Sequence, residues 1–263
     1  MSADFLTTIA AYKRELIAAK RAYYDNLKKN MKPQGMRRYD IFKKAIASPG
    51  QINLIAEIKK ASPSMGLIRD EFDVMKIAKI YKDNGAAAIS VLTEDKYFLG
   101  RFLYLNQVSE NSPVPILMKD FIIDECQIYE GSVNGASAVL LIVAMLEDNQ
   151  MRDLMAAAHA LGLDCLIEVH NEDEIERALD VDAEIIGINN RDLRSLKVDV
   201  ANCLRMIPRI PPGKVIVAES GLKSHADIER VREAGAHAVL IGETFMSADD
   251  IGAKIKEVMH GTN

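Results

Sequence analysis

Glu57 and Lys59 are two ionisable residues inside the most strand-like stretch of the chain, IAEIKKASPSMG (55–66). Residues two apart in an extended chain point to the same face, so the carboxylate and the ammonium leave the strand together while Ile58 points away. Burying either ion is costly unless it is paired or put to use. A carboxylate and an ammonium aimed at one place can serve general acid–base catalysis, and we interpret them in that way.

Glu168 is a second carboxylate inside an apolar run, since Ile167 precedes it and Val169 follows it. Its position in the alternation predicts that it points inward, as Glu57 does. Lys119 directly follows an apolar run and, taken alone, could equally be a solvated loop lysine. The ordinary passage from strand to loop explains a further set of acidic residues, namely Glu94, Asp95, Asp120 and Asp192.

The histidines and cysteines form none of the patterns that bind metals or build a nucleophile. The sequence contains no HExxH motif, no paired cysteines, no Asp cluster and no Ser-His-Asp pattern. Cys126, Cys165 and Cys203 are scattered and odd in number, which fits a reducing cytoplasm better than a disulfide framework. We therefore expect an acid–base site with no cofactor and no metal.

Composition argues against several other classes of protein. A net charge of −5 over 263 residues gives no electrostatic footprint for nucleic acid. No apolar run approaches the ~20 residues of a membrane span. Charged residues also occupy the place where a signal peptide would need its apolar core. We expect a cytoplasmic protein with no nucleic-acid or membrane partner.

Eight short apolar runs after residue 50 predict the elements that position these groups. Each is rich in Ile, Val and Leu, which is typical of parallel strands covered on both faces. The runs are NLIAEI (53–58), AAISVL (87–92), PILM (115–118), AVLLIV (138–143), CLIEV (165–169), EIIGI (184–188), KVIVAE (214–219) and AVLI (238–241). Helical spacing fills most of the intervals, for example 73–85, 149–162 and 224–236, so the alternation predicts a (β/α)8 barrel.

The competing fold is an open doubly wound sheet. That fold often carries a Gly-rich turn after its first strand, whereas a Ser/Pro loop follows the first run here. In a barrel, catalytic groups lie at the carboxyl ends of the strands. Seven of the eight runs end in a charged or hydrogen-bonding residue, and the fourth, which ends in Val143 and Ala144, is the exception. These side chains would therefore meet at one rim.

The first 48 residues stand apart from this alternation. Apolar residues recur along one face of a helix, namely Phe5, Ile9, Tyr12 and Leu16, and the exposed side carries Lys13, Arg14, Lys20 and Arg21. We interpret this N-terminal helical extension as a cap over one end of the barrel, within a single domain spanning residues 1–263. A membrane or nucleic-acid arm fits less well, because Glu15 and Asp25 interrupt the basic charge.

Glycines follow the last two apolar runs, in AESG (218–221) and LIGE (240–243). The loops after strands 7 and 8 of such barrels often bind phosphate through backbone N–H groups, and glycine lets the backbone approach closely. Neither motif is specific by itself. Together, at the ends of the last two strands, they predict a phosphate site.

Taken together, the motifs resemble those of the indole-3-glycerol phosphate synthase family. They are IAEIKKASPSMG, LTEDKYFLG (92–100), ILMKDF (116–121), LIEVH (166–170), IGINNRDL (186–193), VAESG (217–221) and LIG (240–242). The resemblance implies a (β/α)8 barrel with an N-terminal extension, acting in tryptophan biosynthesis without a cofactor. It also implies a substrate, 1-(2-carboxyphenylamino)-1-deoxyribulose 5-phosphate, which becomes indole-3-glycerol phosphate, carbon dioxide and water.

The resemblance also implies which residues act. The catalytic positions are Lys119, Glu168, Lys59, Glu57, Asn189, Glu219 and Ser220. The substrate-binding positions are Ser62, Arg191, Phe98, Phe121, Leu140 and Leu193, and the phosphate-binding positions are Ser62, Gly221, Gly242 and Glu243. Glu243 departs from the pattern, since some members have Ser there. A carboxylate repels phosphate, so we expect only the backbone N–H of Glu243 to serve.

The roles follow from the chemistry of the implied reaction. We assign Lys119 as the acid for ring closure, with a pKa lowered by apolar neighbours and a second cation. Glu168 is the principal acid/base of dehydration. Lys59 binds the substrate carboxylate or acts as a second acid, Glu57 holds both lysines, and Asn189 orients Glu168. The partner is an anionic sugar phosphate, and the chain is expected to be a monomer or a weak homo-oligomer.

Two rival functions share part of the pattern. A sugar-phosphate isomerase on the same barrel would keep the glycines but would need no benzene-sized apolar pocket. A non-catalytic phosphate-binding or assembly subunit would bind without turnover, and Lys119→Ala and Glu168→Gln would leave its behaviour unaltered.

Overall fold

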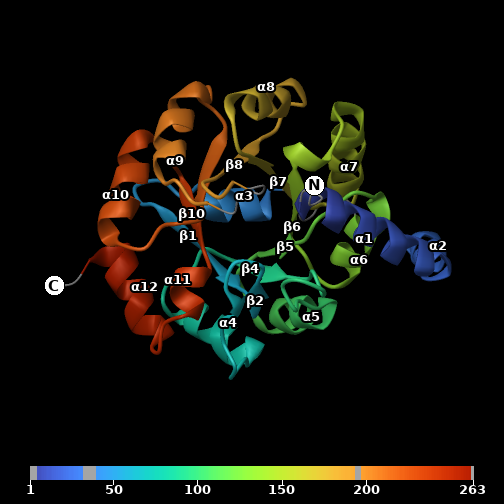
Figure 1. Ribbon diagram of the computed structural model, residues 1–263, viewed down its shortest axis with the longest axis horizontal. Coiled ribbons are helices and arrows are strands. Elements are labelled where there is room, and N and C mark those ends of the chain that lie inside the picture. The colour runs from blue at the N-terminus through green and yellow to red at the C-terminus, as the bar shows by residue number, and fades with distance from the viewer. Residues whose placement is uncertain (1–4, 32–39, 193–196, 262–263) are drawn as a thin grey trace.

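Eight parallel strands form a closed barrel in the computed structural model, which describes residues 5–31, 40–192 and 197–261 (Figure 1). The strands are β1 (Asn53–Ile58), β4 (Ala88–Leu92), β5 (Ile116–Lys119), β6 (Ala138–Ile142), β7 (Asp164–Val169), β8 (Ile185–Asn189), β9 (Val215–Glu219) and β10 (Ala238–Ile241). Each pairs with its neighbour in sequence, and β10 pairs with β1 to close the barrel. All eight apolar runs are strands, which confirms the barrel and excludes the open sheet.

Helices alternate with the strands and cover the barrel (Figure 1). They are α4 (Val74–Asp83), α5 (Phe102–Asn111), α6 (Glu125–Val133), α7 (Asp148–Ala160), α8 (Glu172–Asp180), α9 (Ala201–Met206), α10 (His225–Ala234), α11 (Glu243–Met246) and α12 (Ile251–His260), with short 3-10 turns at Val143–Met145 and Ile207–Arg209. Several begin at a side-chain N-cap, as α10 does at Ser224. No helix in the described part of the chain could span a membrane.

The alternation of each strand separates an apolar interior from a polar mouth. Leu117 and Leu166 belong to the apolar cluster inside the barrel, while Met118 and Ile167 pack outward against the helices. Two residues further along the same inward faces come Lys119 and Glu168, and both line the cavity at the mouth. The strands therefore stack the ionisable groups directly above a close-packed apolar layer.

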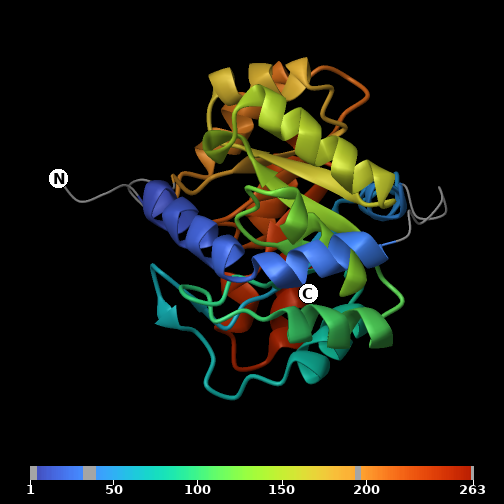
Figure 2. The same ribbon diagram turned by 90° about the vertical axis from the view of Figure 1, so that its right-hand side faces the viewer.

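The N-terminal extension reaches both ends of the barrel, and not one end as expected. It forms α1 (Phe5–Ala19), α2 (Arg21–Asn30) and α3 (Ile41–Ile46), with α1 and α3 at opposite ends in Figure 2. Side chains of α1 and α3 both join the interior apolar cluster. At the end away from the mouth, Asp164 begins β7 and accepts hydrogen bonds from the N–H groups of Asp40, Phe42 and Lys43 at 2.9–3.1 Å.

Lys13 lies on the buried face of α1, which corrects its predicted place on the exposed side. The buried residues of the helix are Leu6, Ile9, Lys13 and Ile17. Lys13 Nζ lies 2.6 Å from Asp120 Oδ1, and Asp120 also accepts from Thr93 Oγ1 and from the N–H of Phe121, each at 2.7 Å. Asp120 is therefore a buried residue that holds α1 against the barrel, and not simply a polar residue at the passage from strand to loop.

Glu94 needs the same correction. It is fully buried, and its carboxylate accepts hydrogen bonds from the N–H groups of Lys96, Tyr97 and Phe98 at 2.7–3.0 Å. The loop after β4 (Ala88–Leu92) is thus folded around this carboxylate. Hydropathy alone does not reveal such anchors, because a buried acid and a solvated one have the same side chain.

We expect Lys13→Met to destabilise the protein strongly, because the change leaves the buried carboxylate of Asp120 without its cation. Removing one partner of a buried ion pair costs about 3–5 kcal/mol. Lys28→Met is the matched control: Lys28 pairs with Glu125 on an exposed surface, where ion pairs contribute little. Urea unfolding followed by circular dichroism measures both variants. Equal unfolding midpoints for the two would contradict a structural role for Lys13.

Candidate active site

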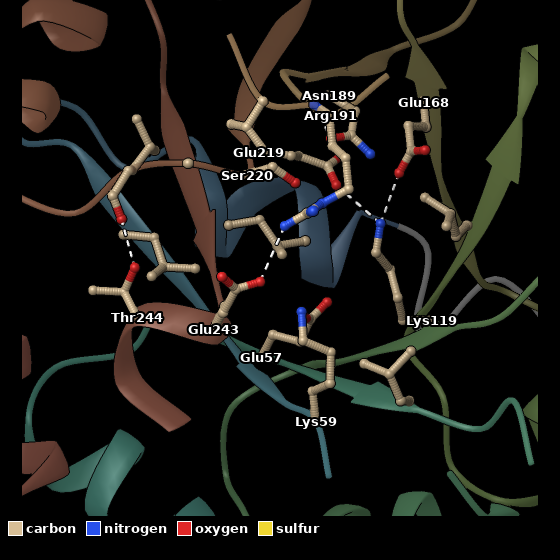
Figure 3. A pocket seen from close by; sticks show the side chains of 18 of the residues that line it. Glu57, Lys59, Lys119, Glu168, Asn189, Arg191, Glu219, Ser220, Glu243 and Thr244 are labelled. Carbon is tan, nitrogen blue, oxygen red and sulfur yellow. Dashed lines mark hydrogen bonds and ion pairs between the residues drawn. The ribbon is translucent and has the colours of Figure 1, made fainter. Parts of the chain in front are cut away.

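A cavity of about 380 Å³ opens at the carboxyl ends of the strands. This volume lies within the range of small-molecule sites in proteins. Its lining includes ionisable and polar side chains from both halves of the barrel: Glu57, Lys59, Lys119, Glu168, Asn189, Arg191, Glu219, Ser220, Glu243 and Thr244 (Figure 3). Segments more than 180 residues apart in sequence thus meet at one mouth.

Lys119 is the central charge of the cavity. Its Nζ lies 2.7 Å from Glu168 Oε2 and 2.9 Å from Glu219 Oε2, and the two carboxylates are almost completely buried (Figure 3). The three residues end the inward faces of β5, β7 and β9, so the barrel wall brings them together. A buried ammonium between two carboxylates is well paired, whereas two carboxylates around a single ammonium leave one negative charge in excess.

The carboxylates set the protonation of Lys119. Burial lowers the pKa of the Lys119 ammonium, but the charges of Glu168, Glu219 and Glu57 outweigh burial and raise that pKa above the usual lysine range. We expected the pKa of Lys119 to be lowered by apolar neighbours and a second cation. The expectation was wrong because the nearest charged groups are carboxylates, while Lys59 is engaged by Glu57. The carboxylates therefore favour the ammonium form of Lys119.

Glu168 and Glu219 both contact this ammonium, but their pKa values are shifted in opposite directions. Burial opposes ionisation of Glu168, yet Lys119 and His170 together hold its pKa below the usual carboxyl range. For Glu219, burial and the charge of Glu168 outweigh Lys119 and raise its pKa to about 7. Two carboxyl groups whose pKa values are pushed apart can take different acid and base roles.

Two glycines, one in β8 and one directly after β10, make space for carboxylates of the cavity. A Cβ on Gly187 of β8 would lie 2.1 Å from Glu219 Oε1, and a Cβ on Gly242 would lie 2.3 Å from Glu57 Oε1. No side chain fits at either position without displacing an acid of the cavity. The glycines in IGIN and LIG therefore have a steric function in the site, in addition to any contact with a ligand.

Glu57 and Lys59 form their own ion pair at the edge of the cavity. Lys59 Nζ lies 2.6 Å from Glu57 Oε1, as their shared strand face predicts. Glu57 is buried, while the ammonium of Lys59 faces the cavity. Lys119 takes its direct contacts from Glu168 and Glu219, so Glu57 acts on it through charge alone.

Arg191 marks a corner of the cavity suited to an anion. Its guanidinium contacts Glu243 Oε2 at 3.0 Å and Ser64 Oγ at 3.3 Å. The backbone after β9 enters the left-handed region, with φ of 65° at Ser220 and 81° at Gly221, and both residues line the cavity. The side chain of Glu243 is thus held by Arg191.

The expected residue Ser62 lies in the hairpin of β2 (Ala61–Ser62) and β3 (Gly66–Leu67) beside the mouth. It contacts Ser64 Oγ at 3.2 Å and is not among the residues that line the cavity. Ser64 is the hairpin serine that meets Arg191. Asn189 lines the cavity, and its Oδ1 accepts from the N–H of Arg191 at 2.9 Å.

Aromatic and aliphatic side chains form the opposite corner. Phe98, Phe121 and Leu140 all line the cavity, as expected, and the ring centroids of Phe98 and Phe121 are 5.9 Å apart. Phe5 of α1 packs edge-on against Phe121, with centroids 5.8 Å apart. The extension thereby supports the apolar corner. Leu193, expected in the same corner, lies outside the described residues.

Several lining residues were not singled out by sequence reasoning, including Ile142, Val198, Val200, Leu222, Lys223 and Thr244. The apolar ones carry no chemical signal, since Val and Leu at a cavity have the same pattern as Val and Leu in a core. Thr244 follows LIGE and donates to the carbonyl of Leu222 at 2.8 Å, which links the loops after β9 and β10. Within the described residues, no group of His, Cys, Asp and Glu is arranged to hold a metal ion.

Comparisons with known proteins place this cavity in context. A family model described as indole-3-glycerol phosphate synthase matches residues 6–258. A protein of that name from Acetivibrio thermocellus is 49% identical over 230 residues, which is 88% of each chain. Another from Endomicrobium trichonymphae is 45% identical over 249 residues, covering 95% of this chain and 93% of the relative.

Solved structures with much lower sequence identity share the fold. A crystal structure of 3-hexulose-6-phosphate synthase aligns with a TM-score of 0.66 at 18% identity, over 81% of this chain and all of that one. The Salmonella typhimurium enzyme of the same name gives 0.65 at 13% identity, over 80% of this chain and 98% of that chain. These two likenesses concern the barrel alone.

We expect Glu219→Gln to stabilise the protein increasingly as pH rises from about 4.5 to 7. The folded-state pKa of Glu219 is raised to about 7, so its contribution to stability is fully present below the unfolded pKa and is lost as pH rises through 7. Glutamine keeps the shape without the charge, and the gain reaches about 3 kcal/mol above pH 7. Urea unfolding across pH 4–8 measures this difference. A constant difference would contradict the raised pKa.

Proposed function

The chain belongs to the indole-3-glycerol phosphate synthase family, and we propose that its barrel mouth closes, decarboxylates and dehydrates 1-(2-carboxyphenylamino)-1-deoxyribulose 5-phosphate without a cofactor. The activity is that of a carboxy-lyase in tryptophan biosynthesis. One observation carries the proposal: a buried ammonium held by two carboxylates lies between an apolar corner and an arginine corner. The three cysteines of the chain are all buried and unpaired, and they support a cytoplasmic location.

The substrate has a matching distribution of properties. Its benzene ring fits the corner of Phe98, Phe121 and Leu140. Its phosphate, with about −1.5 to −2 charge, suits Arg191 and the backbone at Gly221 and Gly242. A sugar-phosphate isomerase would have no use for the aromatic corner, so this corner favours an aryl substrate. Turnover of the carboxyphenylamino ketose, measured against plain ribulose 5-phosphate, separates the two activities.

Ring closure begins when the aryl carbon attacks the ketone carbon. The carbonyl oxygen gains negative charge and becomes a hydroxyl, so it needs a nearby proton. Lys119 carries that proton and a full positive charge in a buried site, where charge stabilisation is strong. Its raised pKa is compatible with this role, because an alkoxide is a stronger base than an amine. Lys59 at the edge of the cavity binds the substrate carboxylate or acts as a second acid, and Glu57 holds it there.

Decarboxylation then restores the aromatic ring, and dehydration completes the indole. Dehydration needs a base for a proton on the ring carbon beside the nitrogen and an acid for the departing hydroxyl. Glu168 is ionised in the resting site and is the principal acid/base of dehydration in this scheme: it delivers a proton to the hydroxyl and takes one from the ring. Glu219, with its pKa of about 7, exchanges a proton with Lys119 beside it. Asn189 faces the cavity between β7 and β9, which suits it to orient Glu168 once substrate is bound.

We expect Lys119→Ala to abolish ring closure and Glu168→Gln mainly to slow dehydration. Each general acid or base contributes about 10²–10⁴-fold to the rate, so each variant should retain less than about a tenth of wild-type turnover. Indole fluorescence of the product measures turnover, with low background because the chain has no tryptophan. Lys254→Ala, on the outer helix α12, serves as the control. Faster turnover than this limit in either site variant would rule out the assigned role.

We expect Glu243→Ser to lower KM several-fold and leave kcat almost unchanged. The carboxylate both repels the phosphate and occupies the guanidinium of Arg191, so its removal strengthens binding throughout the reaction. Glu257→Ser removes the same charge from the outer helix α12 and controls for net charge. Initial rates at low ionic strength measure both constants. A raised KM would mean that Glu243 helps binding by positioning Arg191.

A further inference from the structure

His170 follows β7 directly and is enclosed between two carboxylates. Its Nδ1 lies 3.1 Å from Glu174 Oε2, and its Nε2 lies 3.3 Å from Glu168 Oε1. The imidazole is 12% exposed. Glu168 contacts Lys119 with one carboxylate oxygen and faces His170 with the other. The reaction scheme above uses Glu168 and leaves His170 without a function.

The start of α8 fixes Glu174 in place. Its Oε2 also accepts from the backbone N–H of His170 at 2.8 Å, and its Oε1 accepts from Asn171 Nδ2 at 2.8 Å. Asn171 is the N-cap of α8 and accepts in turn from the N–H of Glu174 at 2.9 Å. An ionised carboxylate can only accept hydrogen bonds, so Nδ1 of His170 carries a hydrogen. This leaves Nε2 directed at Glu168.

One proton must therefore lie between His170 Nε2 and Glu168 Oε1. Without it, the nitrogen lone pair would face a carboxylate in a buried site. Burial lowers the pKa of His170, but the carboxylates of Glu168 and Glu174 outweigh burial and raise that pKa to about 10. The imidazolium is thus the resting form. The two atoms are at ion-pair distance, and Nε2 is buried without an aligned hydrogen bond.

Among the described residues, the ionisable groups in contact with the imidazole are Glu168 from β7 and Glu174 from α8. From α9, Asn202 Nδ2 donates to the backbone oxygen of His170 at 3.2 Å and carries no charge. The contacts therefore run from Lys119 through Glu168 and His170 to Glu174, from the cavity to the outside of the barrel. Glu168 is ionised in the resting site, so any step in which it acts as an acid needs a proton from elsewhere.

We propose that His170 is a positioning residue that acts through Glu168: it orients the carboxylate toward Lys119 and supplies the proton that Glu168 donates in dehydration. This inference rests on the proposed role of Glu168. In the transfer the Nε2–H bond breaks and an Oε1–H bond forms, so imidazolium and carboxylate become neutral imidazole and carboxylic acid.

The remaining proton transfers close the cycle. Glu168 gives its proton to the hydroxyl, which leaves as water with the electron pair of the C–O bond. Glu168 then takes a proton from the ring carbon between the nitrogen and the former hydroxyl carbon, and the electron pair of that C–H bond forms the C=C bond of the indole. That proton returns to Nε2, which restores the imidazolium. No oxidant, reductant or other co-reactant is needed.

A double-mutant cycle of His170→Gln and Glu168→Gln tests the proposal. Alone, His170→Gln should lower kcat about 10-fold or more and change KM less than about twofold, because the lost step is a proton transfer. The acidic limb of its kcat–pH profile should move to higher pH, since Glu168 loses a cation that keeps its pKa low. In the Glu168→Gln background, the same change should cost less than about twofold. His260→Gln, at the end of the outer helix α12, is the control.

Equal losses from His170→Gln in both backgrounds, with an unshifted pH profile, would show a packing role and overturn the proposal. An unaltered kcat would do the same. If Glu168→Gln itself turns over at nearly the wild-type rate, the proposed function of Glu168 fails, and this inference fails with it. Should His170→Gln not fold, Glu174→Gln is the second variant, because it keeps the length of the side chain and removes the charge that stabilises the imidazolium. Its loss of kcat must also vanish in the Glu168→Gln background, and a loss that persists there refutes the proposal.

Discussion

A single buried ammonium, Lys119, held between the carboxylates of Glu168 and Glu219, is the interaction on which the barrel mouth depends. Three strands must end in register to bring an oxygen of each carboxylate within 3 Å of the Lys119 ammonium. Gly187 leaves the space that the carboxylate of Glu219 occupies, and His170 faces the far side of Glu168. Without the ammonium, two acids would be buried side by side with no cation between them, which a fold tolerates poorly. The same cluster supplies the protons and the charge that the reaction requires.

This concentration of charge is compatible with the fold because the rest of the barrel compensates for it. The inward faces below the mouth carry apolar residues such as Ile55, Leu117 and Leu166, and the N-terminal extension adds side chains to the same cluster from both ends. The extension also forms part of the site. Its Phe5 supports the aromatic corner, and its Lys13 neutralises Asp120, the residue next to Lys119. Stability and function are therefore opposed within the mouth, where Glu219 is held in an environment that resists its ionisation.

Sequence alone predicts the parts of this protein that follow from periodicity. Eight apolar runs gave eight strands, and the two-residue spacing placed Glu57, Lys59 and Glu168 on inward faces. Sequence-based prediction fails where the burial or the pKa of a residue depends on which groups contact it in the folded chain. The buried Lys13 was assigned to the surface because a lysine on an amphipathic helix is normally solvated. The pKa of Lys119 was expected to fall because no pattern shows that its nearest neighbours are acids. Ser62, expected at the cavity, lies beside it, and His170 carried no motif that links it to Glu174.

The central claim is that Lys119 rests as an ammonium stabilised by buried carboxylates. Nitrogen-detected NMR of protein labelled with ¹⁵N-lysine follows the side-chain amine of Lys119 directly, and its signal is assigned by its absence from Lys119→Arg. The structure predicts that this amine stays protonated at pH values where exposed lysines, with an ordinary pKa of about 10.4, have titrated. A Lys119 amine that loses its proton near neutral pH would contradict the account, because the carboxylates would then not be the partners that hold its charge.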